Sequence, residues 1–98
     1  MIVVNMKALP IPTGRWFYIG RPTLWGNPFE LTSESERDLV LLKFAEYWYA
    51  PKQKWIRERA MRELPADSTL LCYCAPKRCH GDIIAGYLAW KRTLDKSS

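Results

Sequence analysis

The chain has 98 residues, 48% of them hydrophobic and five of them tryptophan, which suffices for one domain with a modest core and excludes wholesale disorder. Its formal net charge of +5 favours anionic partners such as nucleotides, phosphates or nucleic acid, although a merely solvated basic surface has the same composition. The first apolar run, Met1–Val4, is too short for a signal peptide or a membrane span, and three cysteines do not fit a disulfide framework. We therefore expect a single cytoplasmic domain over residues 1–98 without membrane association.

Two short strands and a loop are expected first. The segment MIVVNMKA (residues 1–8) is β-branched, the segment RWFYIG (15–20) is aromatic, and a Pro/Gly-rich turn separates them, so both are predicted to be strands. Residues 21–31, RPTLWGNPFEL, are predicted to be an irregular loop, because Pro28 removes an amide donor and forces Asn27 out of the helical region. A long irregular loop in so small a domain is often functional.

Two helices are expected next. Ser33 and Glu36 have the S-x-x-E spacing of a capping box, so a helix is predicted to begin there and to be interrupted at Pro51. Its predicted buried stripe is Leu41, Phe44, Ala45 and Trp48. A second helix is predicted over residues 52–64, with a buried face made of Ile56, Ala60 and Leu64.

The last two elements complete the fold class. Residues 69–74, TLLCYC, form an apolar run between turn signals and are predicted to be a buried strand. From about Cys79 an amphipathic helix is predicted, with Ile83, Tyr87, Trp90 and Leu94 on its apolar face. The order β-β-α-α-β-α predicts an α/β protein: a single small sandwich with a short, mostly buried sheet, the last strand central and the helices packed on it. The pattern does not determine whether the strands pair in parallel.

All three cysteines and the only histidine lie within Cys72–His80. Together they form a C-x-C-x4-C-H set, whose spacing differs from the C-x2-C knuckles of common zinc sites, so we assign no metal ligand and no cofactor. Cys72 and Cys74 are better interpreted as small buried residues of the strand, as most free cysteines are.

The start of the last helix is a stronger candidate for a binding site. Free amides and the positive dipole end of a helix bind anions, and ligands of α/β sheets usually bind beyond the carboxyl ends of the strands. Lys77 and Arg78 add positive charge, and Gly81 permits close approach of a ligand or another backbone. A phosphate or other anion is therefore predicted at residues 76–82.

The same segment carries groups suited to catalysis, with Cys79 as nucleophile, His80 as base and Asp82 beside them. A helix N-terminus and basic neighbours lower the pKa of a thiol, which favours Cys79. Neighbours on one helical turn point in different directions, however, so the pattern does not establish an enzyme. Asp82 has an alternative role as a first-turn carboxylate that interacts favourably with the helix dipole.

Two segments carry a resemblance to a known family: YIGRPTLWGNPF, Tyr18–Phe29, and CYCAPKRCHGD, Cys72–Asp82. On these motifs the chain resembles an uncharacterised group of small phage and bacterial proteins, a domain of unknown function. The resemblance covers most of the chain and implies that both segments belong to the family pattern. It implies no activity.

The two motifs form one site if the loop folds over the end of the last strand. Trp25 would then stack on a base, Asn27 would bind its edge and Arg21 would bind a phosphate, while the alternative for Trp25 is a core residue that anchors the loop. The resulting hypothesis is binding of a nucleotide-like or other phosphorylated small molecule between the WGNPF loop and the CHGD helix entrance.

Two other functions remain open. The segment PKQKWIRERAMR favours nucleic-acid binding, because five cations surround Trp55 on one predicted helix. These cations are Lys52, Lys54, Arg57, Arg59 and Arg62. A phage-type protein that binds a host protein would use the cysteine motif only to hold its structure.

Overall fold

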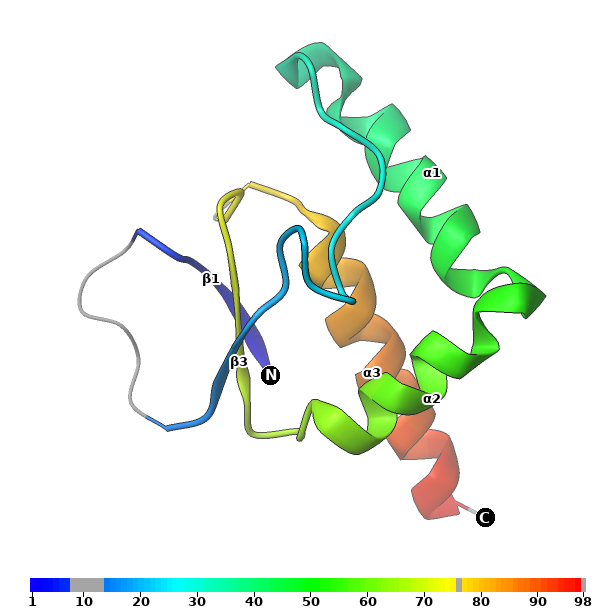
Figure 1. Ribbon diagram of the computed structural model, residues 1–98. Coiled ribbons are helices and arrows are strands. Elements are labelled where there is room, and N and C mark those ends of the chain that lie inside the picture. The colour runs from blue at the N-terminus through cyan, green and yellow to red at the C-terminus, as the bar shows by residue number, and fades with distance from the viewer. Residues whose placement is uncertain (8–13, 76, 98) are drawn as a thin grey trace.

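The computed structural model describes residues 1–7, 14–75 and 77–97, and its elements follow the predicted order (Figure 1). The strands are β1 (Ile2–Asn5), β2 (Trp16–Tyr18) and β3 (Thr69–Cys72), and the α-helices are α1 (Arg37–Tyr49), α2 (Lys54–Glu63) and α3 (His80–Ser97). Short 3₁₀ turns, η1 (Glu34–Glu36) and η2 (Pro51–Gln53), precede α1 and α2. The predicted α/β class and the order β-β-α-α-β-α are confirmed.

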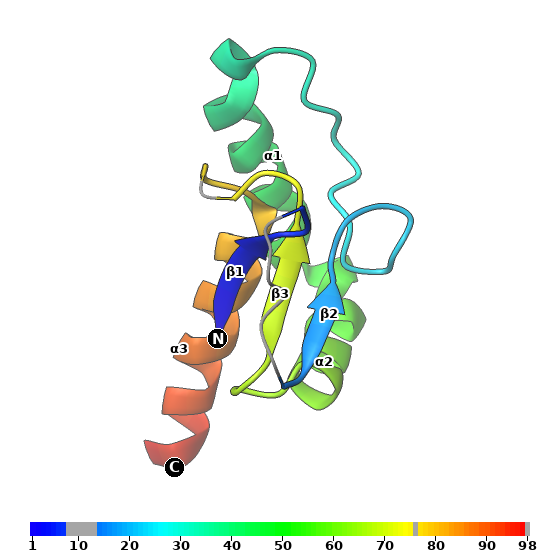
Figure 2. The ribbon, with the colours of Figure 1, turned by 90° about the vertical axis from the view of Figure 1, so that its left-hand side faces the viewer.

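The three strands form one parallel sheet in the order β1-β3-β2. In its register Ile2 pairs with Thr69, and Tyr18 pairs with Leu71. The predicted central position of the last strand is thus confirmed, and all four residues of β3 are buried. The predicted strand is two residues too long, because β3 ends at Cys72 and Tyr73 is exposed. All three α-helices lie on the same face of the sheet, which gives two layers (Figure 2).

The core lies between the sheet and the helices. α1 and α2 meet at η2 in a V-shaped hairpin, and α3 contacts both α1 and β1 (Figure 1). α2 buries its predicted face, because Ile56, Ala60 and Leu64 are all buried. α1 buries Val40, Phe44 and Trp48, so the predicted stripe is correct for Phe44 and Trp48 but is half-buried at Leu41 and Ala45. Within the described residues, no helix has the length and apolarity needed to cross a membrane.

Two local predictions are wrong. Of the predicted apolar face of α3, Tyr87 is buried and Ile83 is half-buried, but Trp90 and Leu94 are exposed. α3 also buries His80, Ile84 and Leu88 against the rest of the molecule. The capping box at Ser33 does not form, because the Ser33 hydroxyl pairs with that of Ser35 and gives no cap, so the chain enters α1 through η1. The helix predicted to begin at Ser33 nevertheless begins nearby, as α1 at Arg37.

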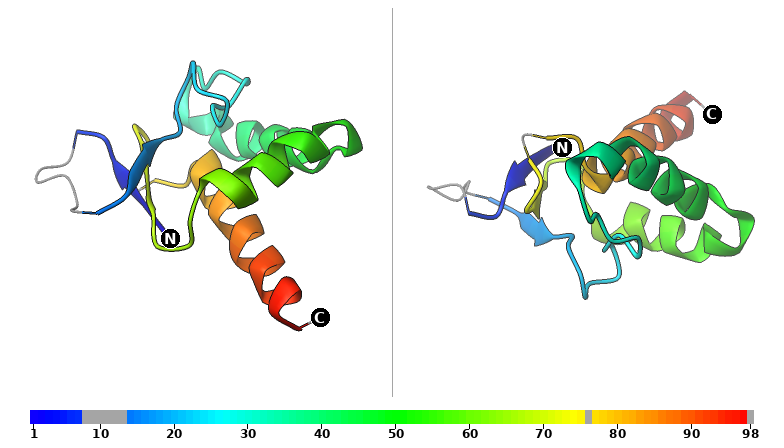
Figure 3. Two further views of the ribbon diagram at one scale, coloured as in Figure 1. Left: turned by 60° about the horizontal axis from the view of Figure 1, so that its bottom comes forward. Right: turned by 90° about the horizontal axis from the view of Figure 1, so that it is seen from above.

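The parallel arrangement places the two motifs at one end of the molecule. Parallel strands end at the same edge of a sheet, so the loop after β2 (residues 19–33) and the turn after β3 (residues 73–79) leave from neighbouring points. Seen from above, this loop runs past the beginning of α3 (Figure 3). The loop after β2, which is predicted to fold over the end of the last strand, therefore lies beside the end of β3 (Figure 3).

Candidate functional site

A cavity of about 330 Å³ lies at the carboxyl ends of β2 and β3. Such a volume falls in the range of small-molecule sites. Both sequence motifs line it, together with the beginning of α1. The lining residues are Tyr18, Gly20, Arg21, Asn27, Phe29, Leu31, Arg37, Val40, Leu41, Cys72, Tyr73, Cys74, Cys79 and His80.

The loop after β2 is held by its own hydrogen bonds, which fix its polar side chains beside the cavity. The Thr23 amide and hydroxyl both donate to the carbonyl of Gly20, at 2.9 and 2.6 Å. Asn27 accepts the amide of Phe29 through Oδ1 at 2.8 Å, which is an Asx turn. Its Nδ2 donates to none of the described residues, so an amide donor remains beside the cavity.

Two arginines supply positive charge to the cavity. Arg21 is exposed, and its guanidinium makes no ion pair with any residue in the described ranges. Arg37, at the first position of α1, donates to Glu34 at 2.7 Å and to the carbonyl of Arg78 at 2.7 Å. Its pKa is raised, first by the Glu34 carboxylate and further by Cys74. Arg21 is therefore the cation with donors left for a ligand, and Arg37 is held in place by the protein.

Two tyrosines form an aromatic rim. The rings of Tyr18 and Tyr73 meet edge to face with their centroids 5.8 Å apart, and both line the cavity. The Tyr18 ring lies so close to Gly20 that a Cβ there would come within 2.2 Å of the phenol oxygen. Glycine at this position therefore allows the tyrosine to fold back over the loop.

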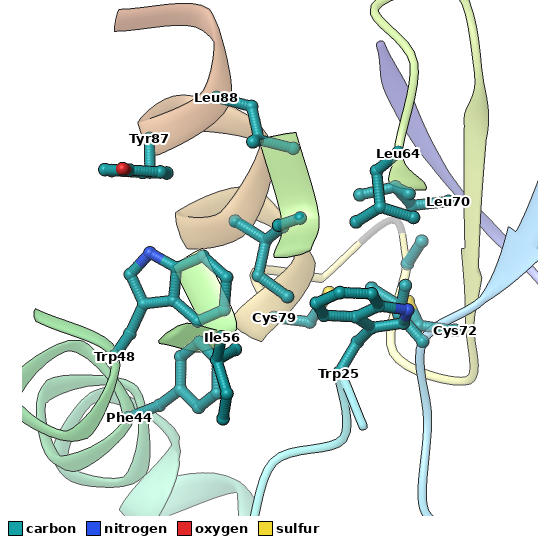
Figure 4. Close-up of a cluster of buried hydrophobic side chains, with 14 residues drawn as sticks. Trp25, Phe44, Trp48, Ile56, Leu64, Leu70, Cys72, Cys79, Tyr87 and Leu88 are labelled. Carbon is teal, nitrogen blue, oxygen red and sulfur yellow. The ribbon is translucent and has the colours of Figure 1, made fainter. Parts of the chain in front are cut away.

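Trp25 is buried in the core, which favours its alternative role as an anchor of the loop. It is 8% exposed, it is absent from the cavity lining, and it points into the same buried cluster as Cys72 and Cys79 (Figure 4). The indole thus fastens the loop to the core.

His80 is buried, contrary to the exposure expected for a catalytic base. Its Nε2 donates to the carbonyl of Ile19 at 2.8 Å, because a carbonyl oxygen can only accept. The imidazole also packs edge to face against Phe44 with ring centroids 5.2 Å apart. Burial lowers the pKa of His80, so the ring is neutral at pH 7 and connects α3 to the loop after β2.

The cations predicted to hold an anion lie outside the cavity. Lys77 pairs with Glu34 at 3.2 Å, and Arg78 pairs with Asp38. Arg37 and Lys77 together lower the pKa of Glu34 to about 2. Gly81 faces the sheet, since a Cβ there would lie 2.6 Å from Cδ1 of Ile19, so it serves close packing of α3 on the strands.

Asp82 caps the beginning of α3 with its side chain, which is one half of a capping box. Its carboxylate accepts the Cys79 amide at 3.0 Å, and its own amide donates to the Cys79 carbonyl at 3.0 Å. A carboxylate therefore already occupies the positive end of α3. The predicted anion at residues 76–82 would compete with it, so the arginine side of the cavity is the better place for an anion.

The cysteines divide into a buried pair and a separate thiol. Cys72 and Cys79 have their sulfurs 3.4 Å apart and are 1% and 2% exposed. The hydrogen bond from Cys79, helped by the amides of Ala75 and Cys74, lowers the pKa of Cys72 to about 6. The same interaction raises the pKa of Cys79, since that thiol keeps the shared proton. Cys74 is half-buried on the Arg37 side of the cavity.

No group of three or more histidine, cysteine, aspartate or glutamate side chains is arranged for a metal ion within the described ranges. Cys72 belongs to the core, as its structural interpretation predicts, and Cys74 is half-buried against that core. Both cysteines also line the cavity.

The basic segment of α2 is largely engaged within the fold. Arg57 donates to the carbonyl of Ala50 at 2.9 Å, Arg59 pairs with Glu63 at 2.6 Å, and Lys54 pairs with Glu58 at 3.7 Å. Lys52 and Arg62 make no ion pair with a residue that the structure describes. This surface therefore offers less free positive charge than its sequence indicates.

Sequence reasoning missed Arg37, Tyr18 and Tyr73 as cavity residues. Tyr18 had a signal, because it opens the YIGR segment at a strand end. Arg37 had none, because its place in the site depends on a contact with residue 78, which is 41 positions away in the chain.

Residues 7–90 match the family described as Domain of unknown function (DUF4326). This range contains both motifs and every residue that lines the cavity. No curated protein and no solved structure matches the chain.

Proposed function

The chain belongs to the DUF4326 family, a domain of unknown function, and we propose that it binds a nucleotide-like or other phosphorylated small molecule in its cavity. The observation that carries the proposal is one cavity of about 330 Å³ that both motifs line and that combines aromatic faces with arginines. A site of this kind suits a ligand with a planar part and an anionic part.

Each part of such a ligand has matching groups. The exposed ring of Tyr73 and the half-buried ring of Tyr18 offer apolar faces for a base. The free Nδ2 of Asn27 donates to a carbonyl or ring nitrogen at the base edge. Arg21 binds a phosphate with its guanidinium, which makes no ion pair with the described residues, and Arg37 adds charge from the beginning of α1.

The proposed activity is binding, with no reaction assigned. Of the three groups expected to do chemistry, Cys79 and His80 line the cavity and Asp82 does not. His80 and Asp82 are both engaged in hydrogen bonds that hold α3. A cytoplasmic location belongs to the same proposal, because three free thiols suit a reducing compartment.

A thermal-shift screen of nucleotides, cyclic dinucleotides, sugar phosphates and dinucleotide cofactors tests the proposal. A ligand at a hundred times its Kd adds about 2.7 kcal/mol, which raises the melting temperature of a domain this size by roughly 10–20 °C. Titration calorimetry then measures the Kd. The absence of any shift across the screen would contradict the proposal.

Three variants locate the ligand. Arg21→Ala is expected to weaken binding about 10- to 100-fold, because a charge-assisted hydrogen bond is worth about 1.5–3 kcal/mol. Asn27→Asp keeps the acceptor for the Phe29 amide but removes the donor and adds a negative charge, so it is also expected to weaken binding. Arg78→Ala is the matched control outside the cavity and is expected to leave the Kd unchanged. Loss of binding in Arg78→Ala, with binding kept in the other two variants, would show that the ligand binds at the beginning of α3 and not in the cavity.

A further inference from the structure

The two buried thiols lie at a distance that suggests redox chemistry. Cys72 ends β3, Cys79 precedes α3, and their sulfurs are 3.4 Å apart. A disulfide bond is about 2.0 Å long, so the sulfurs need to approach by roughly 1.4 Å. Only six residues, 73–78, separate the two cysteines in the chain. A bond between them therefore requires a local movement of two side chains and no rearrangement of the sheet.

The pair is shielded from bulk solvent but open to the cavity. Both cysteines are among the residues that line it, although each is almost fully buried. A small neutral oxidant is therefore expected to reach the sulfurs through the cavity. Cys74 lines the same cavity and is only half-buried, which makes it an internal reference for simple accessibility.

Backbone amides surround the pair and stabilise negative charge on sulfur. The Sγ of Cys79 accepts the amide of Gly81 at 3.3 Å, at the positive end of α3. The backbone amides of Ala75 and Cys74 contribute to lowering the pKa of Cys72. Since the thiolate is the reactive form of cysteine, these donors favour attack by Cys72, with Cys79 as its proton-bearing partner.

We propose that Cys72 and Cys79 are a dithiol–disulfide couple that hydrogen peroxide oxidises through the cavity. The Cys72 thiolate attacks one peroxide oxygen, the O–O bond breaks, and hydroxide leaves and takes up a proton to become water. Cys72 is then a sulfenic acid. The Cys79 thiol attacks that sulfur, the S–S bond forms, the S–O bond breaks, and the hydroxyl group leaves with the Cys79 proton as a second water. Two electrons pass from the thiols to the peroxide.

The experiment is thiol counting and disulfide mapping of the intact chain after peroxide treatment. We expect the reactive thiols of the unfolded protein to fall from three to one, and peptide mass spectrometry to link Cys72 to Cys79. Dithiothreitol is expected to restore all three. Cys74→Ser is the matched control, and its peroxide-treated form is expected to carry the same Cys72–Cys79 link and no free thiol.

Two further variants separate the steps. In Cys79→Ala we expect a slower reaction that stops at a Cys72 sulfenic acid, which dimedone captures, because the hydrogen bond that lowers the pKa of Cys72 is lost. In Cys72→Ala we expect no disulfide. Oxidation of Cys74 while Cys72 and Cys79 stay reduced, or a disulfide that contains Cys74, would overturn the proposal. Mapping of the wild-type chain decides the question even if a variant does not fold. The result does not depend on whether a nucleotide binds.

Discussion

At the scale of single residues, His80 joins the two motifs. Its imidazole is 7% exposed and donates to the carbonyl of Ile19, which directly follows β2. The neutral ring satisfies this carbonyl, whereas a protonated ring would bury a charge next to Arg21, which lowers the pKa further. The residue predicted as a base is therefore better explained as the contact that positions the loop beside the cavity.

This role predicts how stability depends on pH. Because the pKa of His80 is lower in the folded state than its ordinary 6.5, the unfolded chain binds more protons below pH 6.5. The contribution of His80 to the free energy of unfolding is complete above pH 6.5. It falls by up to about 1.4 kcal/mol per pH unit as the pH drops toward the folded-state pKa. Urea denaturation between pH 7.5 and 5 measures this decrease in the free energy of unfolding.

The comparison variant is His80→Gln, whose amide nitrogen reaches toward the same carbonyl but does not titrate. We expect the difference in unfolding free energy between wild type and variant to shrink as the pH falls from 7 to 5. The Glu34 carboxyl, with its pKa lowered to about 2, loses its contribution only below its ordinary 4.5, outside this window. A difference that stays constant with pH would show that His80 titrates normally.

At the scale of elements, the corner between α1 and α2 depends on Arg57. The last carbonyls of a helix have no partners within it. Arg57 donates to the carbonyls of Trp48 and Ala50, at the end of α1, from the middle of the following helix. A residue that the basic pattern suggested for nucleic acid therefore closes the hairpin of α1 and α2.

Arg57→Ala is accordingly expected to destabilise the fold. Hydrogen bonds from a charged group are worth about 1.5–3 kcal/mol, and here one side chain serves two carbonyls, so we expect a loss of about 1–3 kcal/mol. Arg62→Ala, on the exposed side of α2, is the control and is expected to change stability by less than about 0.5 kcal/mol. Chemical denaturation of both variants checks this. Equal losses of unfolding free energy in the two variants would mean that Arg57 acts only through its charge and that its two hydrogen bonds add nothing.

Element types could be read from the sequence, but their orientation could not. Helical spacing placed α3 correctly, yet only the first half of its predicted apolar face, Ile83 and Tyr87, packs inward, whereas Trp90 and Leu94 are exposed. α3 carries apolar residues on more than one face, and periodicity alone does not say which face meets the sheet. Only the packing of Ile84 and Leu88 against the core decides it. The same holds for the S-x-x-E pattern at Ser33, which is common in sequence and here makes no cap.

At the scale of the whole molecule, the site is a product of the parallel topology. The joining of the two motifs could be inferred from the sequence, because a loop after one strand and a turn after another were both expected at strand ends. The cavity itself could not be inferred, because its far wall is α1, and Arg37 reaches the turn at residue 78 only through tertiary packing. For the same reason the sequence did not decide whether Trp25 stacks on a ligand or anchors the loop in the core, because the packing of the whole core determines its burial.

The overall charge raises a last question, whether the excess of 15 basic over 10 acidic side chains makes a nucleic-acid surface. On the basic segment of α2, hydrogen bonds and ion pairs engage Lys54, Arg57 and Arg59, and only Lys52 and Arg62 make neither an ion pair nor a hydrogen bond with the described residues. Two phosphate contacts give a weak dependence on salt, because each contributes about −0.9 to the slope of log K against log salt.

We therefore expect the protein to bind duplex or single-stranded DNA only non-specifically, with a Kd of about 10⁻⁴–10⁻⁶ M at physiological salt. Affinity should fall by roughly tenfold between 50 and 200 mM salt, because about two phosphates are neutralised. Fluorescence anisotropy of labelled oligonucleotides across this range measures both quantities. Lys52→Ala with Arg62→Ala is the informative double variant, because neither side chain supports the fold through an ion pair among the described residues. Nanomolar binding that persists near physiological salt and is lost in this double variant would establish the basic face of α2 as a nucleic-acid surface.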